Sequence, residues 1–123
     1  MDLSEWITQV RRGILEYCIL SLVAQKPRYG YEIASILQQW EPLAITEGTL
    51  YPLLRRLSKE KYITSTWQES SSGPPRKYYY LTESGKDLLE QMNREWNRLI
   101  HGVTEIRQLK GEQNDGAKCE DIS

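Results

Sequence analysis

Hydrophobic residues recur at helical spacing along residues 44–61 and draw one stripe down the side of a helix. The stripe consists of Leu50, Leu53, Leu54 and Leu57. Thr46 can cap this helix by accepting a hydrogen bond from an early backbone N–H. Pro52 lies inside the pattern, so either the helix bends there or its regular part begins nearer Thr49. We expect the Thr46 cap and a bend.

The side chains off the leucine stripe are polar, aromatic or basic, and we expect them to point outward. They are Glu47, Thr49, Tyr51, Arg55, Arg56 and Lys59. A helix with a leucine underside and such an outer side suits the major groove of DNA. Most helices of this kind are only solvated surface helices, and Arg56 could simply pair with Glu60. The residues that follow help to decide between the two interpretations.

Residues 62–69 and 76–82 alternate and are rich in β-branched and aromatic side chains, which is typical of strands. The turn-forming residues 70–75 separate them. The residues expected to share a face are Ile63, Ser65 and Trp67 on the first strand, and Tyr79 and Leu81 on the inner face of the second. The pattern predicts a β-hairpin, with Arg76 and Lys77 near its tip and able to reach phosphate.

Two helices precede these elements. Residues 4–25 form the first, capped by Ser4 and ended before Pro27, and its segment 14–24 is apolar nearly all round, which predicts burial on more than one face. Residues 29–40 form the second. One side of the first helix carries Trp6, Ile7, Val10, Ile14, Cys18 and Leu22, and the inward residues of the second are Ile33, Ala34, Ile36, Leu37 and Trp40. The order predicts a mainly α fold with a β-hairpin wing, a winged helix-turn-helix.

A last helix is predicted over residues 83–110, with Thr82 as its cap. Its apolar residues are spaced alternately three and four apart, as in a coiled-coil seam. They are Leu89, Met92, Trp96, Leu99, Val103 and Ile106. The seam either packs on the first helix of its own chain or is covered by a second subunit, and its length favours the second subunit. The chain thus divides into a DNA-binding domain (4–82), a dimerisation helix (83–110) and a disordered acidic tail (111–123).

The net charge of −1 hides an uneven distribution. Residues 44–82 contain six basic and three acidic residues, a balance of +3, whereas residues 111–123 contain four acidic residues and one lysine, a balance of −3. Local charge matters more than the total for phosphate binding. Tyr29 and Gly30 begin the second predicted helix, where free N–H groups can also hold a phosphate.

Composition argues against several other classes of protein. The sequence has one histidine and neither a metal-spaced Cys/His cluster, a phosphate loop nor a serine elbow, so we expect no enzyme activity, metal or cofactor. His101 lies outside the seam and should be exposed. With two cysteines, no run of eighteen apolar residues and no signal-like N-terminus, the chain is expected to be cytoplasmic and to span no membrane.

Several motifs together resemble the PadR-like winged-helix transcriptional regulators. They are YGYEI at 29–33, GTLYPLLRRL at 48–57, Trp67, RKYYYLT at 76–82 and Gly85. The length and the single long last helix are similar to the smaller subgroup of that family. The resemblance implies a bacterial or archaeal homodimer, joined through its first and last helices, that represses genes until a small molecule or another signal releases it. The family usually has a glycine where this chain has Lys61, so we expect a different turn into the wing.

The resemblance also gives Trp96 two interpretations. In some similar regulators a tryptophan at the matching place flanks a cavity for planar aromatic compounds, whereas here it could equally only fill the dimer interface. Two recognition helices related by a two-fold axis would read an inverted-repeat operator with half-sites about 34 Å apart. The alternative function is a winged-helix module that binds only proteins. The outward residues Tyr51, Arg55 and Lys59 favour DNA over that alternative.

Overall fold

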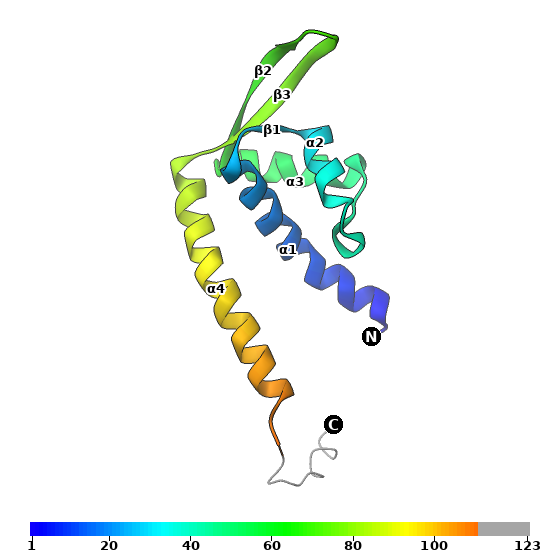
Figure 1. Ribbon diagram of the computed structural model, residues 1–123, viewed down its shortest axis with the longest axis vertical. Helices are drawn as coiled ribbons and strands as arrows, with labels where there is room; N and C mark the ends of the chain where they lie inside the picture. The colour runs from blue at the N-terminus through cyan, green and yellow to red at the C-terminus, as the bar shows by residue number, and fades with distance from the viewer. Residues whose placement is uncertain (111–123) are drawn as a thin grey trace. The chain divides into compact units, whose positions relative to one another are not determined.

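The computed structural model describes residues 1–110, so the predicted disorder of the acidic tail, residues 111–123, lies outside the described residues. Over this range the chain forms four α-helices, a short 3-10 helix and a three-stranded antiparallel sheet with strand order β1-β3-β2 (Figure 1). The predicted mainly α fold with a hairpin wing is confirmed. Contacts divide the chain into one compact unit, Met1–Glu90, and a second that begins at Gln91.

Helix α1 (Leu3–Gln25) buries four residues in the core: Leu15, Ile19, Leu20 and Val23. These residues lie off the side that runs from Trp6 to Leu22, on which Leu22 is half-buried and Trp6 is exposed. An all-round apolar segment leaves the rotation of a helix open, and here the neighbouring elements decide it. The predicted cap at Ser4 is also wrong. The helix is capped by Asp2, two residues before Ser4. The Asp2 carboxylate accepts a hydrogen bond from the Glu5 N–H at 2.9 Å.

Helix α2 (Gly30–Leu37) is shorter at both ends than the predicted 29–40. Its last turn closes at Gln38, and the chain then enters the 3-10 helix η1 (Glu41–Leu43). Trp40 is extended and 54 % exposed, so the prediction that it points inward is wrong. The physical reason is the turn into Pro42, which takes Trp40 out of helical geometry.

Helix α3 (Glu47–Lys59) begins at the predicted cap, where Thr46 Oγ1 accepts the Thr49 N–H at 3.3 Å. Pro52 lies inside the helix, and the bend expected there stays a prediction. The leucine stripe faces the core: Leu50, Leu54 and Leu57 are buried and Leu53 is half-buried. This burial fixes the rotation of α3 and leaves its opposite side in solvent.

The turn after α3 keeps the left-handed conformation despite its lysine. Lys61 has φ 68°, and the Lys61 and Tyr62 N–H groups donate to the Ser58 and Leu57 carbonyls at 2.9 and 3.0 Å. These two bonds are typical of a helix that ends in a left-handed residue. The expectation of a different turn is therefore wrong. Lysine adopts the backbone that glycine would adopt at lower cost, because the hydrogen bonds around the turn hold it there.

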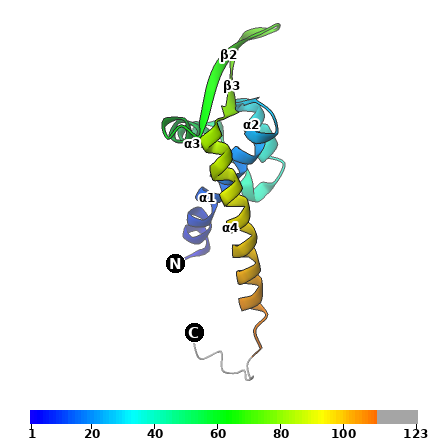
Figure 2. The same ribbon diagram turned by 90° about the vertical axis from the view of Figure 1, so that its left-hand side faces the viewer.

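Strands β2 (Ile63–Ser70) and β3 (Gly73–Leu81) form the hairpin that projects from the helical body (Figures 1 and 2). The turn is narrower than the predicted 70–75, because Pro74 and Pro75 belong to β3. Gln68 pairs with Arg76 and Ser70 with Gly73, so a single residue of β2 opposes the two prolines at a bulge. Bulges tolerate proline in a strand, which explains why its missing N–H does not end β3.

A third strand, β1 (Arg28–Tyr29), pairs antiparallel with β3 and was not predicted, since two residues are too few to show alternation. Arg28 holds this strand to both adjoining helices. Its guanidinium donates to the Leu22 carbonyl of α1 at 2.9 Å and to the Glu32 carboxylate of α2 at 3.0 Å. The strand thereby links the first two helices to the wing.

Helix α4 (Glu83–Arg107) follows the hairpin directly. The predicted cap is confirmed, because Thr82 Oγ1 accepts the Gly85 N–H at 3.0 Å. His101 is exposed, as expected, with its imidazole Nε2 3.8 Å from a Glu105 carboxylate oxygen.

Gly85 is buried against the turn after α3, and a Cβ at this position would lie 2.1 Å from the Tyr62 carbonyl oxygen.

Substitution Gly85→Ala should lower the free energy of unfolding by about 2–4 kcal/mol, because the obstacle to the new methyl group is backbone. Chemical denaturation of the variant measures this loss. Gly13→Ala in α1 is the matched control, since nothing lies within 4 Å of its added Cβ and alanine favours the helix by up to about 1 kcal/mol. Equal stability of the two variants would contradict the close packing at Gly85.

Candidate nucleic-acid interface

The outer side of α3 and the facing side of the hairpin enclose a groove of about 780 Å³, which we call the α3–wing groove. It is lined by Tyr51, Arg55, Arg56, Ser58, Lys59, Ser65, Trp67, Lys77 and Tyr79. Four of these side chains are basic and none is acidic. All of them belong to the compact unit Met1–Glu90. The groove therefore combines positive charge with aromatic surface within one compact unit of the chain.

The end of the Tyr51 side chain packs closely on a glycine of the neighbouring helix. A Cβ on Gly30, the first residue of α2, would lie 2.4 Å from the Tyr51 hydroxyl oxygen and 2.8 Å from a ring carbon. Gly30 is buried, and the Tyr51 ring packs against it. A larger residue at position 30 would therefore require the Tyr51 ring to move.

Two tyrosines of the groove stay neutral phenols at physiological pH. Burial raises the pKa of Tyr51, and the nearby Glu47 carboxylate raises it further. Burial also raises the pKa of Tyr79; the neighbouring Tyr51 adds to this increase and the Arg55 guanidinium opposes it. Tyr51 is 36 % exposed, whereas Tyr79 is buried in the core at 5 %. Because the Tyr51 hydroxyl keeps its proton, it can donate a hydrogen bond to a phosphate oxygen.

Aromatic rings hold the two basic side chains of the wing. The Lys77 ammonium lies 5.9 Å from the centre of the Trp67 ring and 5.8 Å from that of Tyr79, within the α3–wing groove. The Arg76 guanidinium lies 4.5 Å from the centre of the Tyr29 ring. Cation–π contacts of this kind restrict a flexible side chain and leave its N–H groups available to an anion.

The predicted site residues fall into three groups. The first group lines the α3–wing groove and consists of Tyr51, Arg55, Arg56, Lys59 and Lys77. The second group, Tyr29, Gly30 and Arg76, lines an adjoining hollow of about 340 Å³. The two hollows share Tyr51, Trp67, Lys77 and Tyr79 in their linings. Glu47 and Thr49 lie on the exposed first turn of α3, outside both. Arg56 has an ion-pair partner, Glu16 of α1, in place of the Glu60 that the sequence suggested. Arg56 therefore also ties the recognition helix to α1.

Trp67 is a residue of the groove that the sequence analysis missed as a contact. It is 68 % exposed, although tryptophan is among the most hydrophobic side chains. The sequence analysis assigned Trp67 only to one face of a predicted strand. The signal that could have identified it is its pairing with Lys77 across the hairpin, which places both on the side of Ser65 and Tyr79.

Residues 1–110 were searched for metal-binding groups and for membrane-spanning helices. Among residues 1–110, no three His, Cys, Asp or Glu side chains are grouped so that they could hold a metal ion. Across the same range, every helix is too short or too polar to cross a bilayer.

Comparison with known proteins gives concordant results. A PadR-like transcription factor from Bacteroides fragilis is 42 % identical, with a TM-score of 0.69, and the match covers 80 % of this chain and 95 % of that one. A PadR-like transcriptional regulator from Bacillus cereus is 39 % identical with a TM-score of 0.76, covering 83 % of this chain and 99 % of that one. The PadR of Bacillus subtilis, solved in complex with operator DNA, is 30 % identical with a TM-score of 0.58, covering 64 % of this chain and 45 % of that one.

A protein of Lysinibacillus sphaericus whose name states no function is 37 % identical over 91 residues, which is 72 % of this chain and 84 % of that protein. The solved structures from Bacteroides fragilis, Bacillus cereus and Bacillus subtilis are of transcription regulators and not of enzymes. Residues 19–91 match the sequence model of the transcriptional regulator PadR-like family. The matched segment includes α2, α3, the wing and the start of α4. The chain therefore belongs to the PadR-like family of transcriptional regulators.

Proposed function

We propose that this chain is a sequence-specific DNA-binding regulator that works as a homodimeric repressor on an inverted-repeat operator. The observation that carries the proposal is the α3–wing groove, with four basic side chains, three aromatic rings and no acidic side chain in its lining. The operator complex of the similar Bacillus subtilis protein supports it. The first helices and the hairpin would serve to present α3 to the duplex.

The side chains divide the work of binding DNA between bases and phosphates. Helix α3 has the diameter that the major groove admits, and Arg55 lies on its outward side, from which a guanidinium can bind the O6 and N7 atoms of guanine. Lys59 and the wing residue Lys77 line the same groove, where they can neutralise phosphates of the flanking backbone. The neutral phenol of Tyr51 adds a hydrogen bond that carries no charge.

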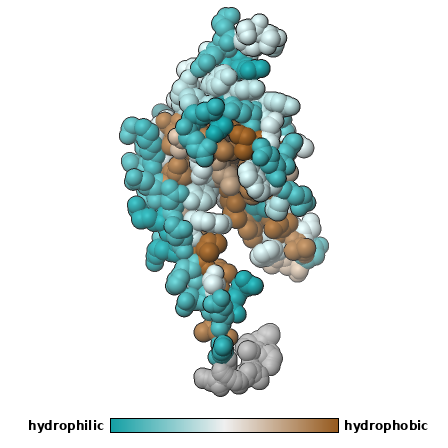
Figure 3. Space-filling model, in the orientation of Figure 1, coloured by the Kyte–Doolittle hydropathy of each residue, from teal (hydrophilic) through white to brown (hydrophobic). Residues whose placement is uncertain are grey.

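Dimerisation is proposed from the exposed apolar residues of α4. Leu99 is 60 % exposed, Val103 52 % and Ile106 70 %, and they continue the three-and-four spacing of the predicted seam. Figure 3 shows apolar surface on the lower part of α4 and, separately, over α1. Exposed apolar side chains at this spacing are unfavourable in water and are typical of an interface. A second copy of α4 covers it in the proposed dimer.

We propose that a signal releases the repressor, as the family resemblance implies. Trp96 lies on the seam and is half-buried within its own chain. A planar aromatic effector between the two Trp96 rings is one form of that signal, and a ring that only fills the interface is the alternative. An effector must bind the DNA-incompetent dimer more tightly than the competent one, because equal affinity shifts nothing.

The function is tested by selecting the genomic fragments that the protein retains. The affinity of the Arg55→Ala variant for these fragments is then measured. Loss of a guanine contact should weaken operator binding by about 1–3 kcal/mol and relax the base preference at one position of each half-site. Fluorescence anisotropy with labelled duplexes measures both effects. Arg94→Ala, which removes the same charge from an exposed position of α4, should leave binding unchanged. If Arg55→Ala and Arg94→Ala bind alike, Arg55 is not in the site.

Trp67→Ala should weaken operator binding by about 1 kcal/mol, because the exposed ring loses its apolar contact with the sugars of the backbone. The slope of log affinity against log salt should stay the same, since no charge is removed. Lys77→Ala is the matched comparison from the facing strand and should flatten that slope by about one unit. An unchanged affinity of Trp67→Ala, or a change in its slope, would contradict an apolar role for this ring.

The double substitution Leu99→Glu and Val103→Glu should convert the dimer to a poorly folded monomer and abolish operator binding, because two charges per chain would be buried in the seam. Sedimentation measures the assembly state. The control pair Asn97→Glu and His101→Glu adds the same groups at exposed positions off the seam and should leave the dimer intact. A native chain that sediments as a monomer at micromolar concentration would end the dimer proposal.

A further inference from the structure

An ion pair joins one basic side chain of the α3–wing groove to α1. The Arg56 guanidinium, which lines the groove, contacts the carboxylate of Glu16. Glu16 itself is not among the lining residues. Its side chain is only 14 % exposed, whereas that of Arg56 is 49 % exposed. The carboxylate is therefore mostly covered by the protein, while its partner reaches the surface that is proposed to meet DNA.

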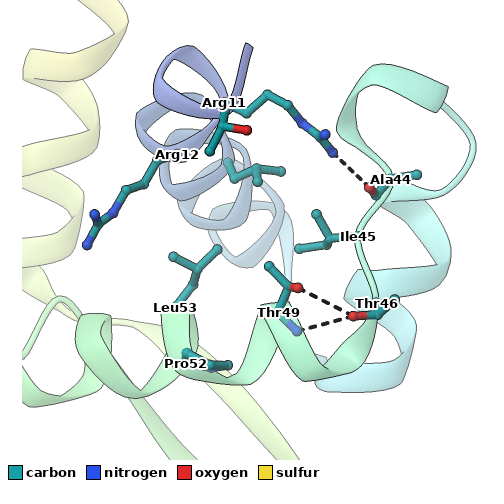
Figure 4. A pocket seen from close by; sticks show the side chains of 10 residues that line it. Arg11, Arg12, Ala44, Ile45, Thr46, Thr49, Pro52 and Leu53 are labelled. Atoms are coloured by element: carbon teal, nitrogen blue, oxygen red, sulfur yellow. Dashed lines mark hydrogen bonds between the residues drawn. The ribbon is translucent and has the colours of Figure 1, made fainter. Parts of the chain in front are cut away.

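The two helices of this pair are also held together by other contacts. Before the start of α3, the Arg11 guanidinium of α1 donates to the Ala44 carbonyl oxygen at 2.8 Å, across the hollow between the two helices (Figure 4). Leu15 of α1 and Leu57 of α3 are buried in the core. Glu16 follows Leu15 along α1, so its carboxylate stays in place if the guanidinium of its partner turns toward DNA.

The covered carboxylate makes exchange of this ion pair for a DNA phosphate unfavourable. A carboxylate that is largely withdrawn from water needs a cation, and removal of that cation is strongly destabilising. A contact between an exposed guanidinium and a phosphate contributes much less, because both groups are well solvated when they are apart. The cost of leaving Glu16 unpaired therefore decides the competition, and Arg56 stays with Glu16 when DNA binds.

We propose that Glu16 is a built-in counterion of the DNA site, which holds Arg56 away from phosphate and limits affinity for DNA of any sequence. With Arg56 neutralised, three of the four basic side chains of the groove remain available to DNA, namely Arg55, Lys59 and Lys77. Phosphate contacts supply the sequence-independent part of binding, whereas base contacts supply specificity. Glu16 is thus a positioning residue that restrains non-specific binding. The inference rests on the proposed function, since it concerns the regulation of the same site.

The test measures affinity for a duplex of random sequence by fluorescence anisotropy, over a range of about 50 to 200 mM salt. Glu16→Gln keeps an acceptor of the same shape and removes the counterion. The variant should bind about threefold more tightly at the low-salt end, and its slope of log affinity against log salt should be steeper by about 0.9, the contribution of one phosphate. Glu90→Gln makes the same change at an exposed position of α4 and should alter neither quantity.

Arg56→Gln, added to the Glu16→Gln variant, identifies the side chain that is responsible. It should remove the whole gain and return the slope to the native value, because the freed guanidinium is the new phosphate contact. The double variant leaves no charge unpaired, so it also tests the inference if Glu16→Gln alone does not fold. Chemical denaturation checks the folding of each variant. A purely structural role of the ion pair would change stability without steepening the slope.

An unchanged or flatter slope of Glu16→Gln would overturn the inference, and so would a gain that survives Arg56→Gln. A double variant whose slope is flatter than the native slope by about one unit would also overturn it, because Arg56 would then already contact phosphate in the native protein.

Lys59→Gln distinguishes failure of this inference from failure of the proposed function. It should flatten the native slope by about one unit, since Lys59 lines the groove and is proposed to neutralise a phosphate. If Lys59→Gln behaves in this way while Glu16→Gln does not steepen the slope, only the role of Glu16 is wrong. If the native chain binds no duplex, or Lys59→Gln leaves the slope unchanged, the groove is not the DNA site and both proposals fail.

Discussion

The carbonyl groups of Lys61 and Tyr62 accept the hydrogen bonds that join the recognition helix, the wing and the last helix. The Thr82 hydroxyl lies 2.7 Å from the Lys61 oxygen, and the Thr82 N–H donates to the Tyr62 oxygen at 3.1 Å. The Ser84 hydroxyl also donates to Lys61, at 2.9 Å. Because these bonds close the base of the hairpin, they fix the wing relative to α3. The left-handed backbone at Lys61 and the close packing of Gly85 both follow from this junction.

The proposed activity depends on that junction, since the α3–wing groove exists only while helix and hairpin keep their relative placement. Within it, the buried leucine stripe sets the rotation of α3, the end of the Tyr51 ring packs on Gly30, and aromatic rings lie beside Lys77. Most of the positioning is thus done by packing and aromatic contacts and not by ion pairs. The charges of the groove remain available for DNA, with the exception of Arg56, which is partly engaged by Glu16.

The sequence predicted the parts of the fold that depend on local periodicity and missed those that depend on distant contacts. The leucine stripe, the Thr46 cap and the hairpin were predictable because neighbouring residues determine them. Strand β1, the Arg56–Glu16 pair and the exposure of Trp40 depend on where separate elements meet, which spacing along the chain does not reveal. The left-handed Lys61 could not be predicted from its own preference, because the surrounding hydrogen bonds override it. Trp67 was predicted as a strand residue, but its place in the groove required the pairing of the two strands.

The central claim is that duplex DNA binds to the α3–wing groove. It is tested most directly by mapping backbone amide chemical shifts of the isotope-labelled protein as a retained genomic fragment is added. The account predicts that the largest changes lie in residues 51–59 of α3 and residues 65–79 of the hairpin. Changes confined to α1, with the hairpin unaffected, would contradict it.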